Sequence, residues 1–340
     1  MLKKLKILGI ETSCDETAAA IVTEDKEIIS HLIYHQFAQH LPYGGVVPEI
    51  ASRAHIDKLD QVIRQVINKA QMDFSDIDAV AVTNGPGLIG GLIVGLMTAK
   101  AISSAAKKPL IAINHLEAHA LMARMTNNVN FPFLLLLISG GHCQILIVEN
   151  IGKYRILGTT KDDALGEAFD KVAKMMNLPY PGGPELEKLA KAGDSKRFAF
   201  PQAFKGDNQC NFSFSGLKTA VKRTIDHLAI LRDQDIADIA ASFHLAILEI
   251  IEDRLINAIK IFKNDYAMAQ DLVITGGVAA NAFIRDRLAQ IARSSDLIFS
   301  APAREFCTDN GVMVAWAGIE RFKLGLIDKI DVEPKARWPL

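Results

Sequence analysis

Several features that would assign this chain to a specialised class are missing from its sequence. Its 340 residues carry 38 basic and 39 acidic side chains, so no overall positive field indicates a nucleic-acid partner, although this balance does not exclude a local basic patch. The four cysteines are isolated, without a Cys-x-x-Cys pair. This pattern favours free thiols in a reducing compartment over a disulfide scaffold or a cysteine-based zinc site.

Long hydrophobic runs are missing as well. The apolar run Leu134–Ile138 has the length of a strand and is far too short to span a membrane. The basic N-terminus is followed too soon by Glu11, Asp15 and Glu16 to be a signal peptide. We therefore expect a cytoplasmic protein without a membrane partner. Its composition, 49% apolar and 23% charged, is that of an ordinary globular protein, and its length favours two domains.

The zinc-peptidase signature His-Glu-x-x-His is also missing, although two histidines stand four residues apart. His115 and His119 open a helical pattern after an apolar run, so they project from one side on successive turns. Such a pair can hold one metal ion if further ligands come from elsewhere, whereas a solvated or core pair is the simpler interpretation. Leu116 occupies the place of the peptidase glutamate, and Glu117 lies on the other side of the helix. A metallopeptidase is therefore disfavoured.

The same order of elements is predicted twice along the chain, as a three-strand meander followed by alternating helices and strands. The first half has strands Ile7–Ile10, Ala18–Val22 and Ile28–His35, helix Pro48–Ala70, strand Ala79–Thr83, a glycine-rich helix, strand Leu110–Ile113 and the histidine helix. The second has strands Phe133–Ile138, Gln144–Val148 and Tyr154–Gly158, a helix starting near Thr160, further helices, and strands Leu272–Thr275 and Leu297–Ser300. This repetition predicts a duplicated α/β fold whose similar domains flank a ligand cleft. The first domain would comprise residues 1–130 joined by a C-terminal helix, 309–340, and the second residues 131–308 with helical insertions.

Glycine-rich turns follow three of the predicted strands, where free backbone N–H groups can approach an anion. They contain Gly140-Gly141 after Ser139, Gly276-Gly277 with Asn281 in the first turn of the next helix, and Gly85-Pro86-Gly87. Each turn alone is more often a plain tight turn. Their recurrence at strand ends of a duplicated fold indicates a nucleotide or phosphate ligand.

Two polar segments each have two interpretations. Thr308 is a candidate N-cap with Asp309 in the first helical turn, where the carboxylate either offsets the helix dipole or completes a His, His, Asp site suited to iron or zinc. The segment Phe212–Arg223 interleaves aromatic, hydroxyl and basic side chains, and Lys218 and Lys222 share a helix face. That face is either solvated or in contact with phosphate.

Taken in order, these motifs resemble the TsaD family of bacterial tRNA threonylcarbamoyladenosine transferases over nearly the full length. The segments that carry the resemblance are Ile7–Thr17, Gly44–Glu49 with Ala51–Arg53 and His55, His115 with His119, Ser139–His142, Gly166–Asp170, Tyr180–Pro184, Phe214–Lys218, Gly276–Val278 and Cys307–Gly311.

The resemblance implies an actin-like (ASKHA) ATPase fold and a tRNA-modifying reaction. The threonylcarbamoyl group would pass from threonylcarbamoyl-AMP to the exocyclic amine of the adenosine 3′ of the anticodon, in tRNAs reading codons that begin with A. The implied metal ligands are His115, His119 and Asp309, with Fe(II) favoured over zinc. The implied donor-binding residues are Ile138, Ser139, Gly140, Gly141, His142, Asp170, Gly183, Glu187 and Asn281. Many relatives carry aspartate at Glu187, which puts that contact in doubt.

The resemblance also implies partners: tRNA, a TsaB-like inactive paralogue, a TsaE-like P-loop ATPase, and a separate synthase that supplies the donor. From their place at the first hairpin turn, we expect Asp15 and Glu16 to orient the threonyl moiety or accept the proton. We expect Lys218, Lys222 and Arg223 to hold tRNA phosphates. The alternatives are a small-molecule kinase or ATPase of the same fold, which leaves the histidine pair without a role, and a non-catalytic paralogue, which the intact His, His, Asp set disfavours.

Overall fold

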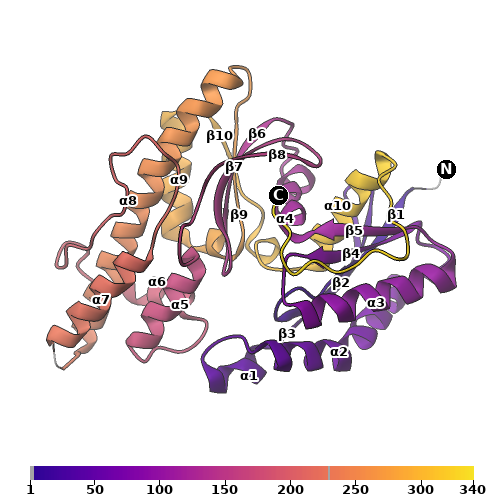
Figure 1. The fold of residues 1–340 in the computed structure, drawn as a ribbon, viewed down its shortest axis with the longest axis horizontal. Helices are drawn as coiled ribbons and strands as arrows, with labels where there is room; N and C mark the ends of the chain where they lie inside the picture. The colour runs from indigo at the N-terminus through magenta and orange to yellow at the C-terminus, as the bar shows by residue number, and fades with distance from the viewer. Residues whose placement is uncertain (1–3, 229) are drawn as a thin grey trace. The chain divides into compact units, whose positions relative to one another are not determined.

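The computed structural model describes residues 4–228 and 230–340, which divide into two compact units (Figure 1). The first unit takes in the chain up to Asn128 together with Thr308–Leu340, and the second is Val129–Cys307. Each unit contains one five-stranded sheet with helices packed against it. The chain therefore returns to the first unit after completing the second.

The sheet of the first unit has the strand order β3-β2-β1-β4-β5, in which β1, β2 and β3 are antiparallel neighbours and β1, β4 and β5 are parallel. The strands are β1 (Lys6–Glu11), β2 (Glu16–Thr23), β3 (Ile28–His35), β4 (Ala79–Gly85) and β5 (Leu110–Asn114). The helices are α1 (Phe37–His40), η1 (Leu41–Tyr43), α2 (Pro48–Lys69), α3 (Ile89–Ala106), α4 (His115–Thr126) and α10 (Gly311–Lys323).

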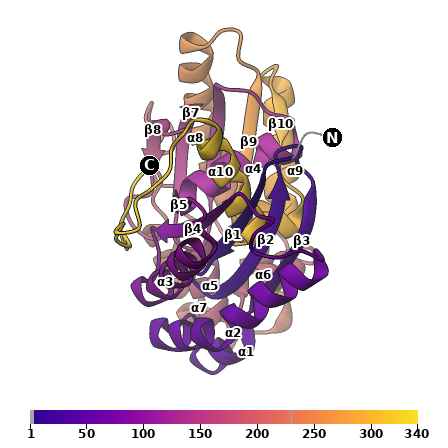
Figure 2. The ribbon, with the colours of Figure 1, turned by 90° about the vertical axis from the view of Figure 1, so that its right-hand side faces the viewer.

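Alternation of side chains along β1 separates the two faces of this sheet. Leu8 and Ile10 share a core cluster with Leu59 of α2 and Leu96 of α3. Gly9 lies between them on the other face, where α10 packs. A strand buried on both faces is apolar along its buried stretch, as residues Ile7–Ile10 of β1 are. Figure 2 shows α2 and α3 on one side of the sheet and α10 on the other.

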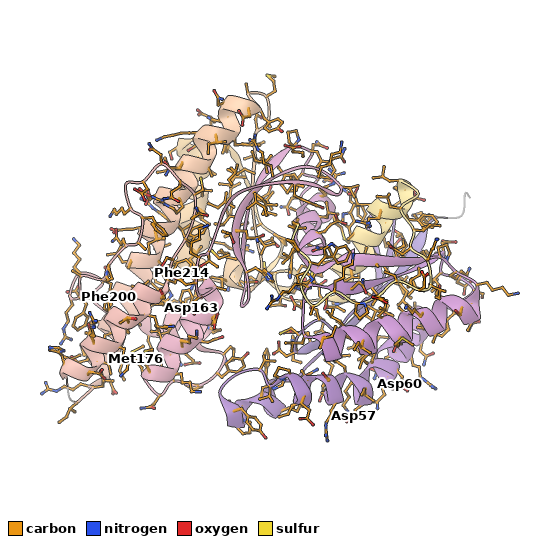
Figure 3. The ribbon with its side chains drawn as sticks, viewed as in Figure 1. Asp57, Asp60, Asp163, Met176, Phe200 and Phe214 are labelled. Atoms are coloured by element: carbon orange, nitrogen blue, oxygen red, sulfur yellow. The ribbon has the colours of Figure 1, made fainter. Side chains whose placement is uncertain are left out.

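The second unit repeats this topology with the strand order β8-β7-β6-β9-β10. Its strands are β6 (Phe133–Ile138), β7 (Cys143–Asn150), β8 (Lys153–Thr159), β9 (Asp271–Thr275) and β10 (Ile298–Ser300). Its helices are α5 (Leu165–Met175), α6 (Gly182–Ala190), α7 (Ser215–Leu228), α8 (Asp233–Asp265), η2 (Gly277–Ala280), α9 (Ala282–Ser294) and η3 (Arg304–Phe306). One large cluster joins the sheet to these helices and includes Met176, Phe200 and Phe214, labelled in Figure 3. The predicted duplicated α/β fold is confirmed.

Two predicted helix boundaries are wrong. The helix expected from Thr160 begins at Leu165, because Thr160 instead bridges to Phe212 and its hydroxyl donates to the carbonyl of Asp163. The C-terminal helix expected over 309–340 covers only Gly311–Lys323, and the described residues beyond it contain no further helix.

Helix α3 stands out for its composition. Among the described residues it is the one helix long and apolar enough to cross a membrane by length and composition, a test that core helices also pass. Only a third of its residues are buried. Ile89, Ile93 and Met97 follow each other at intervals of four and are about half exposed, so they form an apolar stripe along one side of the helix.

Candidate metal centre and glycine-rich turns

The histidine pair lies at the start of α4, directly after β5. The side chain of Asn114 caps this helix by accepting hydrogen bonds from the backbone N–H groups of Leu116 and Glu117. His115 and His119 are both buried, and their ring centroids are 4.7 Å apart. Glu117 points elsewhere and pairs with Arg321 at 2.9 Å, as the sequence predicts for a residue on the other side of the helix.

Asp309 meets both histidines from the opposite end of the unit's sequence. Its Oδ1 lies 3.4 Å from Nε2 of His115 and 3.0 Å from Nε2 of His119. One ligand atom from each of the three residues lies within 4.8 Å of the others. The predicted convergence of the three side chains is therefore present within one unit.

The predicted helical context of Asp309 is wrong. Asn310, not Thr308, caps α10, since its side chain accepts from the N–H of Met313, and the helix begins at Gly311. Asp309 thus lies before the helix. Freed from helical geometry, its carboxylate faces the histidines instead of offsetting the dipole of its own helix.

The partners of the two imidazoles fit a metal ion. Nδ1 of His115 lies 3.2 Å from Oε2 of Glu11 and 3.1 Å from the hydroxyl of Ser13. A proton held on Nδ1 by the Glu11 carboxylate leaves the lone pair of Nε2 facing His119 and Asp309, as metal-bound histidines require. Nδ1 of His119 is buried without a partner among the described residues, so only its Nε2 is engaged.

The protonation states of the side chains in this cluster depend on one another. Burial alone would lower the pKa of His115, but the carboxylates of Asp309 and Glu11 raise it well above its ordinary value. Burial opposes ionisation of Asp309, yet the neighbouring histidines hold the pKa of its carboxyl well below the usual range. A cation in place of the shared proton would satisfy the same carboxylates.

Asp15 and Glu16 lie at the turn from β1 into β2, and both are 8% exposed. Burial, then the negative charges of Asp15 and Asp309, raise the pKa of Glu16 well above its ordinary value. His55 donates to the carbonyl of Cys14 at 2.9 Å, which fixes the backbone of this turn. The structure therefore places these two carboxyls in the same unit as the histidine cluster.

The glycine turns of the second unit meet at the ends of β6 and β9. The turn Ile138–His142 is closed by a bond from the N–H of Ser139 to the carbonyl of His142, 2.8 Å, while Gly140 and Gly141 are exposed. Gly276 has φ +93°, and a Cβ there would lie 2.4 Å from the carbonyl oxygen of Ile138. Glycine at this position therefore allows the two turns to touch.

The remaining predicted donor-binding residues lie at, or bond to, the starts of α6 and α9. Asp170 accepts from the N–H of Gly182 at 2.8 Å, beside Gly183 at the start of α6. Glu187 accepts from the N–H of Ala282 at 3.0 Å. Asn281 is the N-cap of α9 rather than a first-turn residue, and its amide lies 3.3 Å from Nε2 of buried His244.

The three basic residues predicted to contact tRNA lie on α7. Lys218 pairs at 2.5 Å with Asp163, which is labelled in Figure 3, and Lys222 pairs at 3.0 Å with Asp226. Arg223 is exposed and helps to line a surface hollow of about 320 Å³. Two of the three charges are therefore compensated within the unit.

Sequence reasoning did not assign roles to Glu11, Ser13 or Asn114. Glu11 and Ser13 belong to a group of polar residues that directly follows the apolar run of β1. This change from apolar to polar residues at a strand end is the sequence signal that could have indicated their role. The contact of Asn114 with the C-terminal tail had no such signal, because it joins residues 224 positions apart.

Comparison with solved structures identifies the fold. Component A of the (R)-2-hydroxyglutaryl-CoA dehydratase from Acidaminococcus fermentans matches with a TM-score of 0.52 and 17% identity, over 93% of this chain and 98% of that chain. Full-length HypF in its phosphate- and nucleotide-bound form matches with a TM-score of 0.60 and 13% identity, over 95% of this chain and 47% of that one. These likenesses show that the fold is the actin-like α/β fold predicted from the sequence.

Comparison of sequences is more specific. A profile of the family described as TsaD, tRNA N6-adenosine threonylcarbamoyltransferase, matches residues 27–316. Proteins of that name from Brucella suis and Rhizobium leguminosarum bv. trifolii are 54% and 52% identical, over 99% and 100% of this chain and 95% of each relative. The chain therefore belongs to the TsaD family of tRNA N6-adenosine threonylcarbamoyltransferases.

Proposed function

We propose that this chain carries out the transfer of its family at a metal centre built on His115, His119 and Asp309. The observation that carries this proposal is the convergence of two imidazole Nε2 atoms and one carboxylate oxygen within 4.8 Å. Membership in the family implies a divalent metal and a threonylcarbamoyl-AMP donor. Two histidines and one carboxylate suit Fe(II) and also catalytic zinc, since both retain open positions with this set. We propose Fe(II), in keeping with the family resemblance.

The residues around this centre have different roles. A bound metal would act as a Lewis acid on a phosphate or carbamoyl oxygen of the donor. Glu11 and Ser13 hold His115 in the tautomer that turns Nε2 toward Asp309. Both histidines are buried, whereas the Asp309 side chain is 18% exposed, so the cluster is open to a ligand on the side of Asp309. Since the adenylate is a good leaving group, much of the rate would come from positioning.

We propose Asp15 and Glu16 as the groups that orient the threonyl moiety or accept the proton from the attacking amine. A general base works best when its pKa lies near the operating pH. The raised pKa of Glu16 supports this role, because an ordinary glutamate is too weak a base.

We propose that the nucleotide part of the donor binds to the second unit. The open N–H groups at Gly140 and Gly141 are suited to a phosphate, and the N-terminus of α9 adds a favourable dipole. Ile138, Ser139 and His142 would complete this turn. Gly183 and Asn281 lie at the starts of α6 and α9, and Asp170 and Glu187 bond to those starts. Glu187 and Asn281 already bond to the first turn of α9, so they would act through the helix start as well as by direct contact.

We propose that tRNA phosphates contact α7 through Lys218, Lys222 and Arg223. Arg223 is the strongest of these, since the other two are paired with acids. An RNA phosphate would have to compete with Asp163 for Lys218 and with Asp226 for Lys222.

We place the enzyme in the cytoplasm, where four free cysteines remain reduced. A separate synthase would supply the donor, and a TsaE-like P-loop ATPase would assist turnover.

We propose the apolar stripe of α3, formed by Ile89, Ile93 and Met97, as the docking surface for a TsaB-like paralogue. Replacing both Ile93 and Met97 by aspartate is expected to weaken the complex at least a hundredfold, because two buried apolar side chains would become buried charges. Isothermal titration with the purified paralogue measures this. Ile298→Asp is the matched control, since Ile298 is similarly exposed but lies in the other unit. Equal loss in the control, or unchanged affinity in the double variant, would remove the assignment.

The proposed function is tested by reconstitution. Purified chain, with the two partner proteins, is mixed with synthetic threonylcarbamoyl-AMP and unmodified tRNA, and the tRNA nucleosides are analysed. A chelator is expected to stop modification, and adding back Fe(II) is expected to restore it more fully than zinc. Restoration by zinc alone would reverse the choice of metal. Full activity after verified metal removal would overturn the metal centre itself.

A further inference from the structure

Hydrogen bonds hold the chain after α10 against the first unit at several points. We call Asp328–Trp338 the C-terminal strap. The N–H of Asp328 donates to the carbonyl of Leu110 at 2.9 Å, and its carboxylate accepts from the N–H of Ala112 at 2.8 Å. The strap therefore begins against β5 (Figures 1 and 2, yellow).

The strap then crosses the turn that follows β4. The N–H of Lys335 donates to the carbonyl of Asn84 at 2.8 Å, and the Asn84 amide donates to the carbonyl of Glu333 at 2.8 Å. Gly85 has φ +139°, and a Cβ there would lie only 1.8 Å from the carbonyl oxygen of Lys335. The turn thus depends on glycine partly because the strap passes so close.

The strap ends against Asn114, the residue directly before His115. The carbonyl of Trp338 accepts from the amide of Asn114 at 3.0 Å. Asn114 directly precedes His115 and caps the helix that carries both histidines. The backbone of Trp338 is therefore bonded to the residue that directly precedes a candidate metal ligand.

The side chains of the strap have the chemistry of an RNA-binding surface. Lys335 and Arg337 are exposed, and Trp338 is partly exposed with Nζ of Lys335 4.5 Å from its ring centroid. Proteins bind single-stranded RNA by stacking unpaired bases on aromatic rings and by neutralising phosphates with adjacent cations. A near-neutral chain that modifies tRNA needs such a local patch.

We infer that Lys335, Arg337 and Trp338 of the strap contact the anticodon loop of the substrate tRNA. The exocyclic amine of the target adenosine must reach the metal centre, so the neighbouring nucleotides of the loop must pass close to Asn114 and hence to Trp338. An unpaired base would stack on the Trp338 ring, on the face that Lys335 does not cover, and Lys335 and Arg337 would neutralise the flanking phosphates. This inference rests on the proposed position of the reaction at His115, His119 and Asp309.

The test distinguishes a contact between the Trp338 side chain and tRNA from a structural role of the strap in holding α4, the helix that carries both histidines. Trp338→Ala retains the backbone carbonyl that Asn114 binds, so the strap keeps its path. In the reconstituted mixture that modifies tRNA, Trp338→Ala is expected to raise KM for tRNA roughly ten- to hundredfold, the effect of losing one base stack. The kcat, KM for the donor and metal content are expected to stay unchanged.

Charge is tested separately. Lys335→Ala with Arg337→Ala is expected to lower the slope of log Kd for tRNA against log salt concentration by about 1.4, as two lost single-strand phosphate contacts would. Lys329→Ala is the control, an exposed lysine of the strap that lies nine residues before Trp338 in sequence. A photoreactive phenylalanine at position 338 is expected to cross-link to the anticodon loop.

Two results would overturn the inference. One is an unchanged KM for tRNA and an unchanged salt slope, with no cross-link to the anticodon loop. The other is a loss of kcat and metal content at constant KM, which would make the strap a support for the metal helix. Failure of the proposed metal centre is seen independently, as activity that survives Asp309→Asn, and leaves the tRNA-binding measurements interpretable.

Discussion

His119→Ala is expected to lower kcat for tRNA modification about a thousandfold and to release the bound metal, because the loss of a Lewis acid removes several kcal/mol of transition-state stabilisation. His119 is 1% exposed and presents only Nε2 to the cluster, so its removal takes away one of the three converging ligand atoms. Asp309→Asn should have nearly the same effect while conserving shape. Metal content by elemental analysis and single-turnover nucleoside analysis measure the two quantities.

A matched control distinguishes ligand loss from unfolding. His31→Ala changes an exposed histidine of β3 in the same unit and should retain metal and activity. Circular dichroism and the melting temperature should show that Asp309→Asn remains folded. Should His119→Ala keep both its metal and its rate, the histidine pair would be a core pair after all.

The fold could be predicted because the strands of both sheets are recognisable from short stretches of sequence. Residues Ile7–Ile10 of β1 and the whole of β6 are continuous apolar runs, and each is followed by a turn and an antiparallel return strand. The two meanders therefore revealed the duplication without any knowledge of long-range contacts. The helix starts at Leu165 and Gly311 were missed because competing hydrogen bonds of Thr160 and Asn310 decide them.

The candidate site was only partly predictable, for a different reason. Spacing alone places His115 and His119 on one side of a helix, but nothing local connects them with Asp309, 190 residues later. Residue chemistry left a His, His, Asp site as one of two interpretations of Asp309, and the resemblance to a family favoured it. The role of Glu11 depends on β1 lying parallel to β4, whose Thr83 donates to the same carboxylate. The strap has no periodicity at all, so its path could be seen only in three dimensions.

Gly9→Ala is expected to destabilise the first unit by about 3 kcal/mol or more. A Cβ at Gly9 would lie 2.4 Å from the backbone N of Ala315 and 2.4 Å from the carbonyl oxygen of Gly311. Both obstacles are main chain of α10, so rotation of a side chain cannot relieve the clash and the helix must move away from β1. Denaturant unfolding gives the change in free energy, and Gly45→Ala, at a position with nothing within 4 Å, should change it by less than about 0.5 kcal/mol.

The same substitution should also weaken the metal centre, although the atoms nearest to a Cβ at Gly9 belong to Gly311 and Ala315 and not to a ligand residue. Asp309 lies two residues before Gly311, so any shift of the start of α10 moves its carboxylate relative to His115 and His119 on α4. We expect metal affinity to fall at least tenfold in protein that is still folded, measured by competition with a chelating dye. If Gly9→Ala lost stability but bound metal normally, the position of Asp309 would be set by its own loop and not by the packing of α10 on β1.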